Sequence, residues 1–344
     1  MKSKLLGAGL CLMLGAALPF VAADRAWSQD ALKEVTLVIP NPSAINIFPV
    51  WVAIEEGYFE EEGLKVSVEA VDGSSQVLQA MTAGQADIGE PGPGPVLGAR
   101  SRGVDVVFIY NLNPKSSFGI VVPTDSDYQS PADLKGKVIG VGTADGAEVA
   151  FARAILTSLD MTEGEDFTFL PVGDGGLATA AFLRGDIEAY AAATSDAAIL
   201  TYRGQEVRDI TPAEFQSYFG NGFAVLREYM DANPDVVEAF GKGLVRGTVF
   251  ALDPANKEKT LEYAAIGNPQ EGEDPEFASV MFDAVAERKL PVDSSLPWGY
   301  MPPEHWEAWH KSLQAAGALK EPLPDLTAAY TNDYIETWNE DVTR

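Results

Sequence analysis

The stretch from residue 35 to residue 70, VTLVIPNPSAINIFPVWVAIEEGYFEEEGLKVSVEA, contains the hydrophobic patterns that decide the fold. It opens with a continuous apolar run at 35–39, as expected for a strand buried on both faces of a parallel sheet. A turn-rich segment at 40–46 leads into a predicted helix at 49–56, which ends at Gly57. Apolar and polar residues then alternate from residue 64 to residue 70, which is the period of a strand. The stretch therefore predicts strand, helix and strand in that order.

The rest of the chain continues this alternation of short apolar strands with helical stretches. Further strands are predicted at 87–89, 104–110, 137–141 and 188–193, and helices at 74–83, 233–252 and 303–316. Ser130 and Pro131 form an N-cap and first position of one more helical turn. Strands that alternate with helices predict an α/β protein with mainly parallel sheets.

Two segments, VDGSSQVLQAMTAG at 71–84 and VGDGGLATAAFLRG at 172–185, have the same form. Each joins the end of a strand to a glycine-rich turn, a helix and a closing glycine, and an acidic residue and a strand follow. One interpretation is an internal repeat, which would give two similar α/β lobes of about a hundred residues each. The other is that any two strand–helix–strand units look alike.

Acidic residues dominate the 344-residue chain, with 51 Asp and Glu against 24 Lys and Arg and a formal charge of −27. Nucleic-acid binding needs basic surface that displaces counterions from phosphates, so this function is excluded. One cysteine and two histidines leave too few ligands for a zinc, haem or iron–sulfur centre, and we expect no metal and no cofactor. The length favours about two domains.

Residues 1–28 have the features of a secretory signal peptide. Two lysines precede an uncharged apolar run that extends to Ala23, and small residues suit cleavage between Ser28 and Gln29. Cleavage after Ala23 and a membrane anchor are the alternatives. The single cysteine, Cys11, lies in this segment, so the mature protein is expected to hold no disulfide. Removal of the segment takes away three basic residues and one acidic residue, which changes the formal charge from −27 to −29.

Four segments resemble, in the correct order, the signature blocks of the periplasmic substrate-binding proteins of ABC importers. They are FPVWVAIEEGYFEEEGLKV at 48–66, MTAGQADIG at 81–89, LKGKVIGV at 134–141, and NPDVV with the following AF at 233–240. The branch that they resemble most binds sulfonates, taurine, nitrate or thiamine-pyrimidine precursors. The resemblance covers the chain from about residue 35 to its end. The predicted signal peptide agrees with it, because such a receptor works in the periplasm.

The resemblance implies a type II periplasmic binding fold, an α/β architecture with two lobes joined by two crossover strands and a ligand cleft between them. The crossovers are expected near 118–122 and 222–226, so that lobe 1 comprises 29–119 and 225–344 and lobe 2 comprises 120–224. This agrees with the rule that ligands of open α/β sheets bind at the carboxyl ends of strands. The implied partners are a small-molecule ligand and a membrane permease, and the high negative charge favours a monomer.

The loop after the first strand supplies four candidate ligand-binding residues: Asn41, Ser43, Phe48 and Trp51. A cleft receptor needs a few aimed polar groups and aromatic walls. The two aromatic residues could instead belong to the core of the following helix. We favour this alternative for Trp51 and leave it open for Phe48.

Glu90 and Pro91 are the next candidates, because they follow the strand at 87–89, where members of the family present groups to the ligand. Two Gly-Pro pairs in this loop would allow close approach of the backbone. A carboxylate at Glu90 would suit an amine or amidine group. The alternative is a solvated loop acid.

The glycine-rich segment at 140–146, GVGTADG, follows a strand and opens a helix. Its spacing does not match a dinucleotide-binding motif. We expect Asp145, Gly146 and Ala147 at the ligand, with the first amides of the helix holding an anionic or polar group. Asp145 is equally well explained as a plain N-cap.

Three more candidates, Asn111, Asp196 and Asn221, lie at or near strand ends, where each could equally be a turn residue. The segment at 299–310 holds both histidines and two tryptophans. Since His305 and His310 are five residues apart, they lie on different helix faces and are not expected to share a metal. We expect the tryptophans to pack this helix on lobe 1.

These patterns favour a non-enzymatic receptor for a small polar organic ligand. The first alternative is an enzyme like the thiamine-pyrimidine synthase of the same fold, in which a histidine belongs near Ile47 and a cysteine-rich segment is expected; both are missing here. The second is a ligand-sensing subunit for a kinase partner.

The ligand class follows from the candidate groups. A helix N-terminus favours an anionic group, whereas Glu90 and Asp196 favour an amino-bearing group. A taurine-like aminosulfonate or an aminopyrimidine would satisfy both. No arginine lies in a candidate loop, which argues against nitrate-like and multiply charged anions.

Overall fold

The structure, a computed structural model, describes residues 31–215, 218–340 and 342. The predicted signal peptide and Cys11 lie outside the described residues, so neither is tested. The chain from Leu32 onward forms one compact unit. No helix in the described ranges has both the length and the apolar character needed to cross a membrane.

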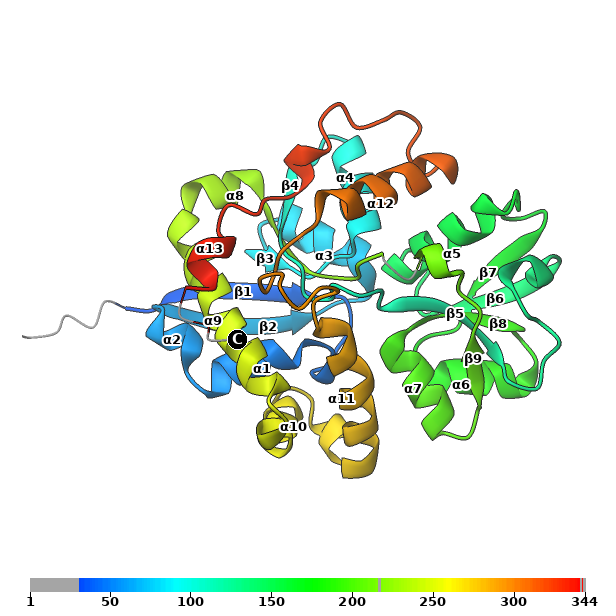
Figure 1. Ribbon diagram of the computed structural model, residues 1–344, viewed down its shortest axis with the longest axis horizontal. Coiled ribbons are helices and arrows are strands. Elements are labelled where there is room, and N and C mark those ends of the chain that lie inside the picture. Colours follow the sequence, from blue (N-terminus) through cyan, green and yellow to red (C-terminus); the bar gives the residue numbers. More distant parts are fainter. Residues whose placement is uncertain (1–30, 216–217, 341, 343–344) are drawn as a thin grey trace, which may run out of the picture. The chain divides into compact units, whose positions relative to one another are not determined.

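The first sheet has five strands in the order β2-β1-β3-β10-β4. Figure 1 labels four of them, β1 to β4. The strands are β1 (Lys33–Ile39), β2 (Leu64–Ala70), β3 (Ile88–Gly89), β4 (Val106–Tyr110) and β10 (Phe223–Leu226). Strand β1 is parallel to β2 and β3, and β10 is antiparallel to both β3 and β4. Helices α1 (Phe48–Glu55) and α2 (Tyr58–Glu61) connect β1 to β2. The strand–helix–strand order predicted for 35–70 is therefore confirmed.

The second sheet repeats this arrangement, with the order β7-β6-β8-β5-β9. Its strands are β5 (Phe118–Pro123), β6 (Lys137–Val141), β7 (Phe167–Pro171), β8 (Ala189–Ala193) and β9 (Val207–Asp209). Strand β6 is parallel to β7 and β8, and β5 is antiparallel to β8 and β9. Helices α3 (Gly73–Thr82) and α6 (Gly176–Arg184) stand in corresponding places, after β2 and β7. The two similar sequence segments thus occupy equivalent positions in two sheets of the same topology.

The chain enters the second sheet at β5 and returns to the first at β10, where the crossovers are expected. The exact lobe boundaries stay a prediction. The turn after Ser130 is a short 3₁₀ helix, in which the Asp133 carboxylate accepts a hydrogen bond from the Ser130 N–H at 2.9 Å. The other predicted strands and helices agree with the structure within one or two residues at each end.

Helices cover both sheets and complete the chain. The remaining α-helices are α4 (Pro93–Ser101), α5 (Ala147–Ser158), α7 (Thr194–Tyr202), α8 (Arg227–Ala232), α9 (Pro234–Leu252), α10 (Lys257–Gly267), α11 (Pro275–Lys289), α12 (Pro303–Ala315) and α13 (Ile335–Trp338). The short 3₁₀ helices are Ile45–Ile47, Pro131–Leu134, Ala213–Phe215, Pro254–Asn256, Pro269–Gly272 and Thr327–Ala329. Helix α9 packs on α1 and α2, where the Phe59 and Phe240 rings stack at 5.3 Å.

Helix α12 packs on the first sheet through Trp306, as expected, and also contacts a helix of the second sheet through Trp309, which was not expected. Trp306 meets Phe108 of β4 with ring centroids 5.3 Å apart, whereas Trp309 meets Phe151 of α5 at 6.0 Å. The Trp309 indole N–H also donates to the Phe219 carbonyl at 3.1 Å. Both tryptophans are fully buried in one apolar core that includes residues from both sheets. This core joins the two sheets on the α12 side.

Candidate functional site

A cavity of about 760 Å³, measured with its open mouth, lies at the carboxyl ends of the parallel strands of both sheets. Residues just beyond each of these strands line it: Asn41, Ser74, Glu90, Thr143, Asp174 and Thr194. The repeated topology explains this placement, because equivalent loops of the two sheets face the same space. The position also agrees with the rule for ligand sites in open α/β sheets.

Three carboxyl groups from the second sheet's loops gather at the cavity. They belong to Glu148 in the first turn of α5, Asp174 after β7 and Asp196 in the first turn of α7. Burial raises the pKa of Glu148 to about 7, and Asp174 and Asp145 add repulsion. Burial also raises the pKa of Asp174 and Asp196, that of Asp196 well above its ordinary range. Asp174 accepts a hydrogen bond from the Tyr190 hydroxyl at 3.3 Å, and Asp196 accepts one from the Ala193 N–H at 3.2 Å. These bonds offset the desolvation only in part, so charge on the trio stays costly without a cationic partner.

The glycines of the 140–146 segment make room for these carboxyl groups. A Cβ on Gly142 would collide with the Asp174 carboxylate, and one on Gly146 would collide with both Glu148 carboxylate oxygens. Glu148 accepts a weak hydrogen bond from the Thr143 N–H at 3.4 Å. Its carboxyl group thus folds back over the N-terminus of α5. The anion site expected at this helix N-terminus is already occupied by an acidic side chain of the protein.

Glu90 has a buried basic neighbour, Lys289, at the end of α11. Lys289 is 1% exposed, and its Nζ donates to the Asn46 carbonyl at 2.8 Å and to Asn113 Oδ1 at 3.0 Å. Burial raises the pKa of Glu90 and lowers that of Lys289, while the attraction between the two groups opposes both changes. Lys289 thus provides a positive charge beside Glu90. Most of the acidic groups of the cavity that have no such basic neighbour are therefore those of Glu148, Asp174 and Asp196.

Several buried polar atoms of the cavity wall have no hydrogen-bond partner among the residues described. They are Ser117 Oγ, Thr143 Oγ1 and Asn221 Oδ1. Buried polar groups in folded proteins are nearly always hydrogen-bonded to protein, water or ligand. The two hydroxyls can donate or accept a hydrogen bond and the Asn221 oxygen can accept one, and a ligand or an ordered water would supply the missing partners.

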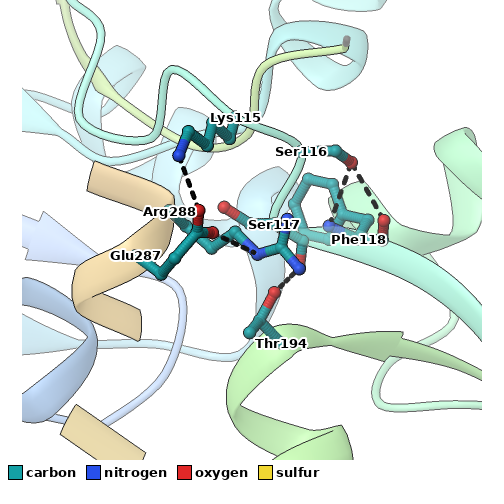
Figure 2. A network of polar contacts seen from close by, with 7 residues as sticks. All are labelled: Lys115, Ser116, Ser117, Phe118, Thr194, Glu287 and Arg288. Atoms are coloured by element: carbon teal, nitrogen blue, oxygen red, sulfur yellow. Dashed lines mark hydrogen bonds and ion pairs between the residues drawn. The ribbon is translucent and has the colours of Figure 1, made fainter. Parts of the chain in front are cut away.

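Arg288 brings a guanidinium group to the cavity from the C-terminal end of α11 (Figure 2). Among the described residues that line the cavity it is the only arginine or lysine. The expectation drawn from the absence of arginine in the candidate loops is therefore wrong for the cavity as a whole. Sequence reasoning missed Arg288 because it lies on a helix whose packing brings it to the site.

Half of the predicted site residues line the cavity: Asn41, Glu90, Gly146, Ala147, Asp196 and Asn221. The Asn41 side chain also stabilises its own loop, because its Oδ1 accepts a hydrogen bond from the Ser43 N–H at 3.0 Å. The cavity also contains unpredicted residues, among them Ser117, Glu148, Asp174 and Arg288. Of these, Asp174 had a signal in the sequence, because it lies in the repeated glycine-rich turn.

The other six predicted residues do not line the cavity: Ser43, Phe48, Trp51, Pro91, Asn111 and Asp145. Phe48 is fully buried against Phe282, with ring centroids 4.8 Å apart, and Trp51 packs between two apolar clusters, so the core alternative applies to both.

The four polar or loop residues of this group have other positions. The Ser43 hydroxyl donates to Glu271 Oε1 at 2.6 Å, and the Pro91 carbonyl accepts from the Gly222 N–H at 3.3 Å. Asn111 donates through its side-chain amide to the Tyr300 carbonyl at 3.3 Å. Asp145 is exposed beside the cavity.

The predicted close approach at the Gly-Pro pairs occurs, but toward protein. A Cβ on Gly92 would collide with the Cβ of Ala147, at the start of α5. The glycine therefore lets the loop after β3 pack directly on the second sheet's helix. Among the described residues, no group of three or more His, Cys, Asp or Glu side chains is placed to hold a metal ion.

Comparison with solved structures shows the fold. The alkanesulfonate-binding protein SsuA of Xanthomonas axonopodis pv. citri, bound to MOPS, superposes with a TM-score of 0.66 at 20% identity, over 87% of this chain and 98% of SsuA. Two mixed sheets with surrounding helices match the type II periplasmic binding protein structures, as the resemblance implies.

Comparison with known sequences gives both receptors and enzymes. The riboflavin-binding protein RibY of Chloroflexus aurantiacus is 26% identical over 91% of this chain and 89% of its own length. The 4-amino-5-hydroxymethyl-2-methylpyrimidine phosphate synthase THI11 of Saccharomyces cerevisiae is also 26% identical, over 91% of this chain and 90% of its own. The model of the NMT1/THI5-like family matches residues 44–257. Because this match spans more than half of the chain, the protein belongs to the NMT1/THI5-like family.

Proposed function

We propose that the protein is the solute-binding receptor of an ABC importer, and that it captures a small organic ligand with an amino, amidine or similarly donor-rich group. The observation that carries the proposal is the trio of carboxyl groups, Glu148, Asp174 and Asp196, which line the cavity from the second sheet's side and whose pKa values desolvation raises. A cationic or donor-rich group in the cavity would stabilise their charged form, as opposite charges do in buried sites. The unpartnered atoms of Ser117 and Asn221 would supply orienting hydrogen bonds.

The setting of the receptor is part of the same proposal. The sequence features of a secretory signal and the fold shared with periplasmic binding proteins support a periplasmic location. The partner would then be a membrane permease, to which the two lobes, 29–119 with 225–344 and 120–224, deliver the closed ligand complex. The type II fold supports this division of the chain, since its ligands bind between two such lobes.

An enzyme of the synthase type is the second candidate, because THI11 matches nearly the whole chain. The synthase resemblance requires a histidine near position 47, where this chain has isoleucine, fully buried in the core. The receptor is favoured because an isoleucine cannot transfer protons or bind a cofactor.

The test is a binding assay followed by recovery of the ligand. The purified protein is screened by thermal shift against aminopyrimidines, taurine, alkanesulfonates, aromatic carboxylates and polyamines, and each hit is titrated calorimetrically. A hit present at about a hundred times its Kd adds roughly 2.7 kcal/mol to the free energy of unfolding. We expect an amine-bearing hit that is recovered unchanged by mass spectrometry. Chemical conversion of the hit would overturn the receptor assignment.

A pair of variants tests the role of the acid trio. Asp196→Asn should weaken binding of the amine-bearing hit, because it removes one carboxylate from the cavity wall. Asp125→Asn, which changes an exposed carboxylate, should leave the Kd unchanged. Equal affinities of both variants and the unmodified protein would show that the trio does not recognise the amine.

A further inference from the structure

Arg288 has a guanidinium nitrogen that donates a hydrogen bond to none of the described residues. Its side chain is 37% exposed, and it extends from the end of α11 toward Ser117, just before β5, and Thr194, at the start of α7 (Figure 2). The guanidinium Nε is buried and has no hydrogen-bond partner within the described ranges. A planar guanidinium presents several donors in a fork that fits a carboxylate, sulfonate or phosphate.

The adjacent carboxylate, that of Glu287, pairs more closely with Lys115 than with Arg288. Lys115 Nζ lies 2.6 Å from Glu287 Oε1, whereas Arg288 Nε lies 3.7 Å from Glu287 Oε2 (Figure 2). The shorter contact satisfies Glu287 through Lys115, and the longer one exceeds hydrogen-bond distance. No described residue accepts a hydrogen bond from the buried Nε, and the exposed part of the Arg288 side chain is the part that a ligand would contact.

The other positive groups near the cavity, the N-terminus of α5 in its lining and Lys289 behind it, are already engaged. The N-terminus of α5 is covered by the Glu148 carboxyl group, which lies where an anion would have to bind. Lys289 is buried, faces Glu90 and donates to Asn46 and Asn113. An anionic group in this cavity would find free donors at Arg288 and at the unpartnered hydroxyl of Ser117.

We propose that Arg288, with the Ser117 hydroxyl, binds an anionic group of the same ligand whose amine meets Glu148, Asp174 and Asp196. The inference rests on the proposed function and narrows it: the solute is bipolar, with a carboxylate or sulfonate at one end and a donor-rich group at the other. Arg288 then gives the protein a higher affinity for bipolar ligands than for plain amines. The anionic partner of Arg288 is a group of the ligand and not the Glu287 carboxylate, because Glu287 forms its shorter ion pair with Lys115.

The experiment compares matched compounds on the purified protein by calorimetric titration. One set comprises 4-(aminomethyl)benzoate, benzylamine and benzoate; the other comprises taurine and ethylamine, so that carboxylate and sulfonate are tested separately. A charge-assisted hydrogen bond predicts that a bipolar compound binds about 10- to 100-fold more tightly than its matched amine. Arg288→Gln should abolish this difference and leave the Kd of the plain amine unchanged.

Two further variants separate recognition from loss of structure. Arg153→Gln, which changes an arginine paired with Glu163 away from the cavity lining, should not alter any Kd. Glu287→Gln should tighten the binding of the bipolar compound, because it removes a negative charge beside Arg288. A merely structural role of Arg288 would not produce an effect of this sign.

The outcomes distinguish this inference from the proposed function. If plain amines bind as tightly as bipolar compounds, or if Arg288→Gln weakens both equally, the Arg288 assignment is wrong while the receptor proposal stands. If only the anionic compounds bind and Arg288→Gln abolishes this binding, the amine specificity fails and the anion assignment stands. If no compound of either set binds, both are overturned for ligands of this class.

Discussion

Replacing Glu148 with glutamine should remove a pH-dependent loss of stability from the ligand-free protein. Burial raises the pKa of Glu148 from its ordinary value of 4.5 to about 7. Between these two values the folded state binds more protons than the unfolded state, so the free energy of unfolding falls as the pH rises through this window. Below pH 4.5 the contribution is fully present, and above pH 7 it is lost.

The size of the effect follows from the two pKa values. One pKa unit corresponds to 1.36 kcal/mol, so a rise from 4.5 to about 7 costs about 3 kcal/mol of unfolding free energy once Glu148 is ionised. Asp174, Asp196 and Glu90 have raised pKa values and act in the same direction. Lys289, whose pKa is lowered, makes stability rise with pH above about 7. The difference between the protein and the Glu148→Gln variant reports the Glu148 contribution together with its repulsion of Asp174 and Asp196.

The assay is urea unfolding at pH 5, 6, 7 and 8, without ligand. We expect the unmodified protein to lose about 2.5 kcal/mol more than Glu148→Gln between pH 5 and pH 8, since part of the effect is already lost at pH 5. Glutamine keeps an oxygen that can accept from the Thr143 N–H, so the variant retains this contact. Glu165→Gln, at an exposed position, is the control and should follow the unmodified protein. Parallel pH profiles of all three proteins would refute the reasoning.

Three further predictions concern packing. Gly92→Ala should cost about 1–3 kcal/mol in urea unfolding, because its Cβ would collide with Ala147. Gly98→Ala, at a roomier position in α4, should instead stabilise by up to about 1 kcal/mol, and a loss at both sites would contradict the packing argument. Trp309→Phe should lower stability by about 1–3 kcal/mol in thermal unfolding, because it leaves the buried Phe219 carbonyl unpaired; a neutral change would contradict this. Phe48→Ala should cost about 3–5 kcal/mol, measured against Ile266→Ala, an exposed control expected within about 0.5 kcal/mol.

Local patterns predicted the elements well, because their causes lie within a few residues. The first strand follows from a continuous apolar run, and α9 begins at Pro234 because proline suits the first position of a helix. The insertion of β10 between β3 and β4 has no such local cause. It depends on contacts between residues more than a hundred positions apart, and only the family resemblance anticipated it.

The site was predictable where it follows from strand ends and not where it follows from packing. Glu90 and Asp196 line the cavity because parallel strands of a sheet end at one edge. Lys289 lies on a helix and is fully buried, although lysine is rarely buried without a partner. Its position becomes understandable only when Glu90, distant in sequence, is seen beside it. Phe48 shows the opposite case, in which an aromatic residue of a promising loop belongs to the core.

The strand orders of the two sheets have a consequence for how the chain folds. All strands of the second sheet come from the continuous segment between Phe118 and Asp209, whereas the first sheet lacks its fourth strand until Phe223–Leu226 joins it. Closing the first sheet therefore requires a loop that contains the whole second sheet, and the entropy of closing that loop is smaller once the segment is compact. We expect the second sheet to form first and the first sheet to be completed around it, so that hydrogen-exchange protection during refolding appears in β5–β8 before β10.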